Sequence, residues 1–300
     1  MAENNKKTIF IDGKVIAQTI KNEIKLEVSK LLDCGKRPPH LVAVLVGNDG
    51  ASLSYVKSKE KQSMEVGFTS SLYKFPETIS EKEFLETLDY LNNDSEVDGY
   101  IVQLPLPKHI NTKNVIAHVD PKKDVDGFHP VNAGRMLLSM PSYLPATPFG
   151  IITLIERSGI ETVGKNCVVL GRSDIVGTPM AVLMSRKGMD CTVTLCHSRT
   201  KNLKEICSQA DILIAAIGKP LFVTEDMVKQ GAIVIDVGIH RVEDKSEKGY
   251  HIIGDVDFDK VAPKCSYITP VPGGVGPMTI VSLLINTLKA YKHEIYEHEI

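Results

Sequence analysis

Short, uninterrupted apolar runs recur along this chain of 300 residues, each separated from the next by a segment with helical periodicity. Strands that are apolar throughout must be buried on both faces, which is typical of a parallel sheet covered by helices. The sequence therefore predicts an α/β fold. The expected strands are "HLVAVLVG" (40–47), "DGYIVQLPL" (98–106), "NCVVLG" (166–171), "CTVTLCHS" (191–198), "ADILIAAIG" (210–218) and "GAIVIDVG" (231–238).

Two stretches rich in proline and glycine divide this pattern and mark candidate domain boundaries. They are "MPSYLPATPFG" at 140–150 and "TPVPGGVGPMT" at 269–279. Between them strands and helices alternate closely, as in a dinucleotide-binding unit. The last helix, "TIVSLLINTLKAYKHEI", is expected to pack back on the first part of the chain. The predicted domains are 1–146 together with 278–300, and 147–277.

The balance of charges argues against a nucleic-acid partner. The chain carries 35 Lys and Arg against 37 Asp and Glu, a formal net charge of −2, whereas nucleic-acid binders are strongly basic. The longest apolar runs, such as "ILIAAI" at 212–217, are too short to span a membrane, and the opening residues show no signal-peptide pattern. We expect a cytoplasmic protein that binds a small molecule and no membrane.

The six cysteines are scattered through apolar segments with no C-x-x-C spacing. This usage is typical of buried, reduced thiols in a cytoplasmic protein. Cys191, Cys196 and His197 come nearest to a set of metal ligands, but their spacing fits no zinc pattern. The sequence predicts no metal site.

A glycine-containing turn follows one apolar run and opens a helix, in "GRSDIVGTPMAVLM". Gly171 permits a tight turn at the end of the strand, and Gly177 permits close approach of backbone or ligand. Thr178 and Pro179 are expected as the N-cap and first residue of the helix, whose free N–H groups attract phosphate. Because the turn departs from G-x-G-x-x-G, it is equally consistent with a structural role.

The end of the next strand favours NADP over NAD. NAD-binding proteins place an Asp or Glu here for the ribose 2′-hydroxyl, but this chain has His197, Ser198 and Arg199. Together with Arg172 from the preceding turn, these donors would accept a 2′-phosphate that a carboxylate would repel. If the turn binds a dinucleotide, the sequence predicts NADP.

Tyr55 and Lys59 lie four residues apart in an otherwise ordinary charged helix. At about 100° per residue, Lys59 is about 40° from Tyr55, whereas Lys57 and Lys61 point about 200° and about 240° away. Lys59 is therefore expected on the inward face, where a Lys is paired, functional, or extended along apolar surface with its amine in water. Short-chain dehydrogenases also use Tyr-x-x-x-Lys, but there the pair follows the glycine turn, whereas here it precedes it.

Two further segments carry polar groups that would share a pocket with this pair. Gln103 ends an apolar strand that Pro105 and Pro107 terminate, and α/β sheets bind ligands at the carboxyl ends of their strands. Asp124 and Asp126 follow, and they are consistent with a binding site or with a solvated acidic turn. An EF-hand calcium loop is excluded by the residues at its first and last ligand positions.

Nine short motifs, spread over nearly the whole chain, carry a resemblance to a known family. They are "ASLSYVKSKEKQSMEVG", "VQLPLP", "PKKDVDGFHPVNAGR", "PATPFGI", "GRSDIVGTPMAVLM", "CHSRT", "GAIVIDVGI", "GDVDF" and "TPVPGGVGPMT". Each motif is weak alone, but all nine in this order closely resemble the bifunctional methylenetetrahydrofolate dehydrogenase/cyclohydrolase family (FolD type).

The resemblance implies two domains around a cleft, an N-terminal α/β folate-binding catalytic domain and a Rossmann-type NADP-binding domain. It implies an enzyme that oxidises 5,10-methylenetetrahydrofolate to the 5,10-methenyl form with NADP. The same cleft would then hydrolyse the methenyl form to 10-formyltetrahydrofolate. The partners implied are tetrahydrofolate one-carbon derivatives and a second copy of the chain, as a homodimer.

The resemblance also implies roles for individual residues. Lys59 would be the central catalytic residue, handling protons chiefly in the hydrolysis, and Gln103 would hydrogen-bond to it. Tyr55 would stack on the folate, and Asp126 would anchor the pterin. The other substrate-binding residues would be Leu104, Pro105 and Gly276. The cofactor would be held by Thr147, Gly171, Arg172, Ser173, Ile175, His197, Ser198, Gly218, Ile239 and Thr279.

Two positions depart from the family pattern, and two alternative functions remain. Ala146 replaces a commonly seen Cys, and His240 follows "DVGI" where Asn is usual, at the nicotinamide end. One alternative is a dehydrogenase without efficient hydrolysis, against which the intact catalytic motifs argue. The other is a non-catalytic dinucleotide-binding module, which would leave an inward Lys, a strand-end Gln and an acidic loop without a role.

Overall fold

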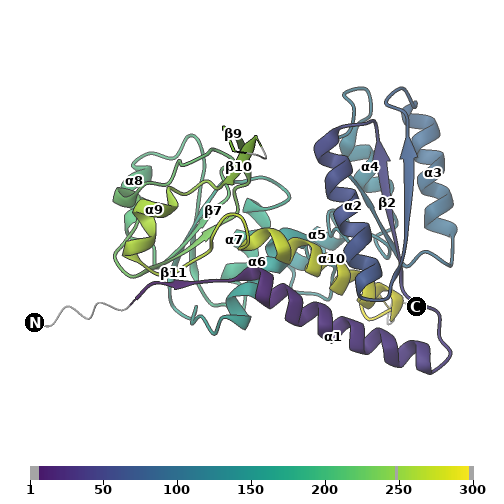
Figure 1. The fold of residues 1–300 in the computed structure, drawn as a ribbon, viewed down its shortest axis with the longest axis horizontal. Coiled ribbons are helices and arrows are strands. Elements are labelled where there is room, and N and C mark those ends of the chain that lie inside the picture. The colour runs from purple at the N-terminus through teal and green to yellow at the C-terminus, as the bar shows by residue number, and fades with distance from the viewer. Residues whose placement is uncertain (1–6, 247–248, 297–300) are drawn as a thin grey trace, which may run out of the picture. The chain divides into compact units, whose positions relative to one another are not determined.

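The computed structural model describes residues 7–246 and 249–296, and it confirms an α/β fold built on parallel sheets. No helix in those two ranges is long and apolar enough to cross a membrane. The chain forms two compact units (Figure 1). Unit 1 consists of the residues up to Ala17 and of Thr147–Thr279, and unit 2 consists of Gln18–Ala146 and the residues from Ile280 onward.

Unit 2 is built on a three-stranded parallel sheet with helices on both faces (Figure 1). Its elements are β2 (His40–Val46), α2 (Gly50–Glu65), β3 (Thr69–Phe75), α3 (Glu81–Asn93), β4 (Gly99–Val102), α4 (Thr112–His118) and α5 (Pro130–Leu137), together with most of α1 (Gly13–Asp33) and of α10 (Val275–Tyr291), whose first residues belong to unit 1. Successive residues of the central strand β2 face opposite sides. Val42 and Val44 pack with α3 and α4, whereas Leu41 and Ala43 pack with α2 and α10. Both faces of this sheet are therefore buried in the hydrophobic core of the unit.

Unit 1 contains a six-stranded parallel sheet in the order β1-β11-β8-β7-β5-β6. Its elements are β1 (Ile9–Phe10), α6 (Ala146–Arg157), β5 (Asn166–Leu170), α7 (Gly177–Ser185), β6 (Thr192–Cys196), α8 (Leu203–Ser208), β7 (Ile212–Ala215), η1 (Glu225–Met227), β8 (Ala232–Asp236), β9 (His240–Glu243), β10 (Tyr250–Ile253), α9 (Phe258–Val261), η2 (Ala262–Lys264) and β11 (Cys265–Ile268). The chain leaves β5 for β6 on one side and returns to β7 on the other. Ligands of open α/β sheets bind at such a reversal of strand order.

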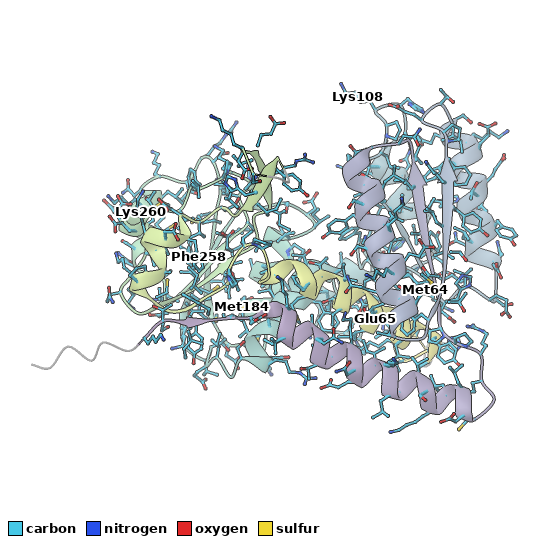
Figure 2. All side chains as sticks on the ribbon, in the orientation of Figure 1. Met64, Glu65, Lys108, Met184, Phe258 and Lys260 are labelled. Carbon is cyan, nitrogen blue, oxygen red and sulfur yellow. The ribbon has the colours of Figure 1, made fainter. Side chains whose placement is uncertain are left out.

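Residues 7–17 belong to unit 1, whereas the expected domain 1–146 placed them with the rest of the N-terminal half. Ile9 and Phe10 of β1 pair in parallel with Tyr267 and Ile268 of β11. The Phe10 ring also lies 5.5 Å, centroid to centroid, from the ring of Phe258, which is labelled in Figure 2. A two-residue strand carries no periodic signal, so the sequence pattern does not reveal this pairing.

Candidate active site

Lys59 lies on the inward face of α2, as the helical periodicity predicts. Its side chain is 8% exposed, whereas Lys57 and Lys61 on the same helix are exposed. The Lys59 Nζ donates a hydrogen bond of 3.3 Å to Gln103 Oε1 and lies 5.3 Å from the centroid of the Tyr55 ring. The helix thus presents one buried amine to an amide and an aromatic ring.

Burial and charge shift the protonation of this cluster. Burial lowers the pKa of Lys59, while the Asp126 carboxylate acts in the opposite direction. Burial raises the pKa of Asp126, and the Lys59 ammonium opposes that rise. Burial, and then the charge of Asp126, raise the pKa of the Tyr55 hydroxyl. The predicted catalytic side chains of unit 2 therefore lie close together. Because burial lowers its pKa, the Lys59 amine loses its proton more easily than the amine of a free lysine.

Gln103 follows directly after β4, and its amide is held in one orientation. Its Nε2 donates a 2.8 Å hydrogen bond to Leu104 O, so Oε1 is the atom that accepts from Lys59. Leu104 precedes Pro105 in a cis peptide, and Leu104 and Asp126 line the same small pocket of unit 2. Leu104, which is predicted to border the substrate, therefore lines the same pocket as Asp126.

Asp124 is buried, so the interpretation of the acidic loop as a solvated turn is wrong for this residue. It is 4% exposed, and its carboxylate accepts hydrogen bonds from Phe128 N (3.1 Å), His129 N (2.8 Å) and Asn132 Nδ2 (2.9 Å). Burial raises its pKa to about 7 in spite of these bonds. Asp124 thus anchors the turn that carries Asp126.

This buried carboxyl predicts a pH dependence of stability. Its pKa rises from an ordinary 3.8 in the unfolded chain to about 7 in the folded protein. Between these values the folded state binds more protons than the unfolded state, so this group makes the protein less stable as pH rises. The contribution amounts to at most about 4 kcal/mol, because one pKa unit corresponds to about 1.4 kcal/mol.

Urea unfolding of the wild type and of Asp124→Asn, at about pH 5 and about pH 8, measures this effect. The unfolding free energy of the wild type relative to the variant is expected to decrease from the lower to the higher pH. The contributions of the other titrating groups are the same in both proteins, so they cancel from the difference between the two unfolding free energies. A difference that stays constant with pH would contradict the assignment.

Gly171 and Gly177 close the βα turn at the reversal of strand order. Gly171 has φ of 111°, and a Cβ on it would lie 2.1 Å from Ala216 O after β7. A Cβ on Gly177 would lie 2.0 Å from Gly171 O. Both positions therefore require glycine, because strand end and helix start touch through their backbones.

The start of α7 differs from the expectation. The helix begins at Gly177 with Val176 as N-cap, so Thr178 is not its N-cap. The reason is Ser173, whose Oγ accepts hydrogen bonds from Val176 N (3.2 Å) and Gly177 N (3.3 Å). These two N–H groups, expected to be free for a phosphate, are bonded within the protein. Arg172 and Ser173 are themselves exposed on the turn.

The predicted 2′-phosphate residues follow two neighbouring strand ends. Leu170 of β5 is paired with Cys196 of β6, so Arg172 and His197 follow directly adjacent positions of the sheet. The His197 Nδ1 accepts a 3.2 Å hydrogen bond from Arg199 N, which assigns the proton of the neutral ring to Nε2. The strand end thus presents donors and, in "CHSRT", no carboxylate.

Three other predicted cofactor residues, Ile239, Thr147 and Thr279, also belong to unit 1. Ile239 is 55% exposed and lines a pocket of about 250 Å³ together with Gly276 and the loop 270–277. The hydroxyls of Thr147 and Thr279 are 3.1 Å apart. Gly276, predicted for the folate, and Ile239, predicted for the cofactor, therefore share one pocket wall.

Sequence reasoning missed the buried carboxylates behind this pocket. Asp255 is fully buried and accepts hydrogen bonds from Gly218 N (2.9 Å), Ile217 N (2.8 Å) and His240 Nε2 (2.7 Å). Asp236 is 3% exposed, and burial raises its pKa to about 6. The available signal was an Asp that directly follows an apolar run, as in "AIVID".

Comparisons with known proteins identify two matching family models. Residues 11–126 match the tetrahydrofolate dehydrogenase/cyclohydrolase catalytic domain, and residues 145–295 match the NAD(P)-binding domain of the same proteins. The "Bifunctional protein FolD" of Cytophaga hutchinsonii is 59% identical over 94% of this chain and 98% of its own length.

Two solved structures share the fold over almost their whole length. The bifunctional FolD dehydrogenase/cyclohydrolase of Campylobacter jejuni is 44% identical, with a TM-score of 0.91 over 96% of this chain and 99% of that one. The Trypanosoma brucei dehydrogenase-cyclohydrolase, complexed with NADP cofactor and an inhibitor, is 36% identical, with a TM-score of 0.91 over 97% and 99%.

Proposed function

The chain belongs to the tetrahydrofolate dehydrogenase/cyclohydrolase family, and on this premise we propose how its own residues carry out both reactions of a bifunctional enzyme. The enzyme oxidises 5,10-methylenetetrahydrofolate to the 5,10-methenyl form and hydrolyses that to 10-formyltetrahydrofolate. The observation that carries the proposal is the buried Lys59, bonded to Gln103 and in the field of Asp126.

The residues of unit 1 fit NADP. Gly171 and Gly177 allow a tight βα turn at the reversal of strand order, and Arg172 and His197 offer donors at adjacent strand ends. Ser173 and Ile175, in the turn after β5, and Ser198, after β6, are exposed, and Gly218, Ile239, Thr147 and Thr279 complete the set. When bound, NADP accepts the hydride that leaves the methylene carbon.

Lys59 moves the protons of the hydrolytic step. A water adds to the methenyl carbon, and the neutral amine of Lys59 accepts the proton that this water loses. The resulting ammonium returns a proton to N5 as the bond between that carbon and N5 breaks. The second proton of the water passes to solvent, which leaves the formyl group on N10. Burial supports this role because it lowers the pKa of the amine.

Three neighbours hold the amine and the substrate. Gln103 accepts one N–H of Lys59 through an amide oxygen that cannot take its proton, which orients the Lys59 lone pair without neutralising it. The Tyr55 ring, 39% exposed, offers a face for the folate beside Lys59. By the family resemblance, the Asp126 carboxylate accepts the N–H groups of the pterin, and Leu104 and Pro105 border the substrate.

The orientation of Gln103 predicts a shift in the pH profile. Gln103→Glu places a negative charge where an amide oxygen lies 3.3 Å from Lys59 Nζ, which stabilises the ammonium. Because hydrolysis requires the neutral amine, its rate rises with pH through the pKa of Lys59. The variant should move this rise to higher pH by about 1 to 2 units, measured by methenyltetrahydrofolate hydrolysis across pH.

Gln18→Glu is the control for this charge. Gln18 lies on α1 in unit 2, is exposed and bonds to Asn22 on the same helix, so the variant adds the same charge to the same unit at a solvated position. Its pH profile is expected to match that of the wild type. Equal profiles for Gln103→Glu and Gln18→Glu would contradict the assigned contact.

We also propose a cytoplasmic homodimer. Reduced thiols support the location, because the six cysteines are free, and disulfides are rare in the cytoplasm. The dimer rests on the family resemblance, and sedimentation at low and high protein concentration tests it. A monomer at all concentrations would refute it.

Two assays on the purified wild type test the function itself. With 5,10-methylenetetrahydrofolate, reduction of NADP is expected to be faster than reduction of NAD at equal concentrations. With the methenyl form and no nicotinamide, hydrolysis is expected to exceed the rate in buffer. Failure to reduce either cofactor would refute the proposed dehydrogenase activity. Hydrolysis no faster than in buffer would refute the proposed cyclohydrolase activity, and the protein would then be a dehydrogenase only.

A further inference from the structure

Asp255 joins three segments of unit 1 that are distant in sequence. One carboxylate oxygen, Oδ2, accepts from Ile217 N and Gly218 N in the turn after β7. The other, Oδ1, accepts a 2.7 Å hydrogen bond from His240 Nε2 at the start of β9. The side chain of His240 is 20% exposed, and that of Asp255 is fully buried. A single carboxylate therefore fixes the turn after β7 to the hairpin β9–β10.

Close backbone packing holds Asp255, and with it the junction between the turn after β7 and the hairpin β9–β10, in place. The Asp236 carboxylate accepts from Gly238 N (2.9 Å), Asp255 N (2.9 Å) and Val256 N (3.0 Å). A Cβ on Gly238 would lie 2.4 Å from Asp255 N, and one on Gly254 would lie 1.8 Å from Asp236 Oδ2. Neither glycine can be replaced without displacing a carboxylate or its backbone. The position of Asp255 is thus determined by its surroundings, and His240 bonds to a carboxylate whose place is fixed.

His240 is the side chain that donates a hydrogen bond to the buried Asp255 carboxylate. Asp236 is a second buried carboxyl nearby, and its pKa is raised chiefly by burial and in smaller part by Asp255. Within the described part of the chain, His240 is the side chain that donates to Asp255 Oδ1. Without His240, that oxygen would have no side-chain donor there. A buried charge that loses a partner draws in water or moves its neighbours.

The hydrogen bonds of Asp255 hold two predicted cofactor segments, the turn with Gly218 and the strand that follows Ile239. Ile239 precedes His240 and lines the pocket with Ile252 of the facing strand β10. Gly218, held by Asp255, is a predicted cofactor residue. We infer that His240, acting through Asp255, is a positioning residue that sets the distance between Gly218 and Ile239 and thereby the affinity for NADP. This inference rests on the proposed assignment of the cofactor site.

Two substitutions separate the hydrogen bond from the volume of the ring. His240→Gln keeps a donor, because the glutamine Nε2 is as many bonds from Cβ as the histidine Nε2. His240→Leu fills similar space without a donor. His251→Ala is the matched control, since His251 lies on the other strand of the same hairpin and bonds to Asp244 Oδ2 at 2.8 Å, with a half-exposed side chain.

The readout is the dissociation constant of NADPH for each purified protein, followed by nucleotide fluorescence, alongside hydrolysis of methenyltetrahydrofolate without nicotinamide. His240→Leu is expected to raise the dissociation constant about tenfold, because part of the binding energy must then restore the spacing of Gly218 and Ile239. His240→Gln should stay within about threefold of the wild type. His251→Ala should bind NADPH as the wild type does, and its hydrolysis, which depends on Lys59 in unit 2, should be unchanged.

Equal NADPH affinity in His240→Leu and the wild type would overturn the inference. So would an equal loss in His240→Gln and His240→Leu, because the donor would then not matter. A wild type that neither binds NADPH nor reduces NADP would instead refute the proposed cofactor site. If His240→Leu does not fold, the comparison of His240→Gln with the wild type decides, since a tenfold loss there contradicts the role assigned to the donor.

Discussion

Lys59→Met is expected to lower the rate of methenyltetrahydrofolate hydrolysis by about 10²- to 10⁴-fold, the range that a positioned proton-transfer group contributes. Methionine keeps an unbranched side chain in the buried space and removes only the amine. NADP reduction with methylenetetrahydrofolate should fall much less, because hydride transfer depends mainly on placing the two reactants. The rate of each reaction, measured separately, gives the two effects.

Lys57→Met is the matched control, because Lys57 lies two residues away on the same helix and is exposed. It should retain both activities. Lys59→Arg adds a sharper comparison, since an arginine holds the positive charge but does not release its proton near neutral pH. Hydrolysis at the wild-type rate in Lys59→Met or Lys59→Arg would refute proton transfer by Lys59.

Arg172→Ala is expected to weaken NADP binding by about 10- to 100-fold while leaving NAD binding nearly unchanged. The reason is that a charge-assisted hydrogen bond to a phosphate contributes about 1.5 to 3 kcal/mol, and only NADP carries the 2′-phosphate. KM values for both cofactors, measured with saturating folate substrate, give the ratio. The preference for NADP should therefore decrease in the variant.

Lys187→Ala removes an exposed cation beyond the other end of α7 and serves as the control. Its KM for NADP should match that of the wild type, at equal ionic strength, because exposed charges are screened over about 10 Å. Parallel loss of NADP and NAD binding in Arg172→Ala would show a general role for the turn rather than recognition of the 2′-phosphate.

Helical periodicity predicts the inward position of Lys59 but not its role. The angle of Lys59 on the helix, which depends only on spacing, distinguishes it from Lys57 and Lys61, and the structure places it on the inward face. The central catalytic role of Lys59 is what the family resemblance implies. The apolar runs likewise predicted β2, β4, β5, β7 and β8, because strands buried on both faces need no partner information to be recognised. The run at 191–198 also predicted β6, but this edge strand is only partly buried, with Thr192 and Thr194 exposed.

Features that depend on distant partners were not predictable. β1 is two residues long and pairs with β11, and the hairpin β9–β10 is partly exposed and charged, so neither carries an apolar run. The burial of Asp124 depends on donors from residues 128–132. The contact of His240 with Asp255 requires the hairpin to fold back, a long-range event that spacing does not encode.

The central claim is that one protein carries both reactions, and a single progress curve tests it most directly. The wild type is given 5,10-methylenetetrahydrofolate and NADP, and NADPH and 10-formyltetrahydrofolate are quantified together until the reaction stops. We predict that the two products accumulate in equal amounts, with the methenyl form only transient. NADPH formed while the methenyl form persists at its rate of hydrolysis in buffer, or no NADPH at all, would contradict the account.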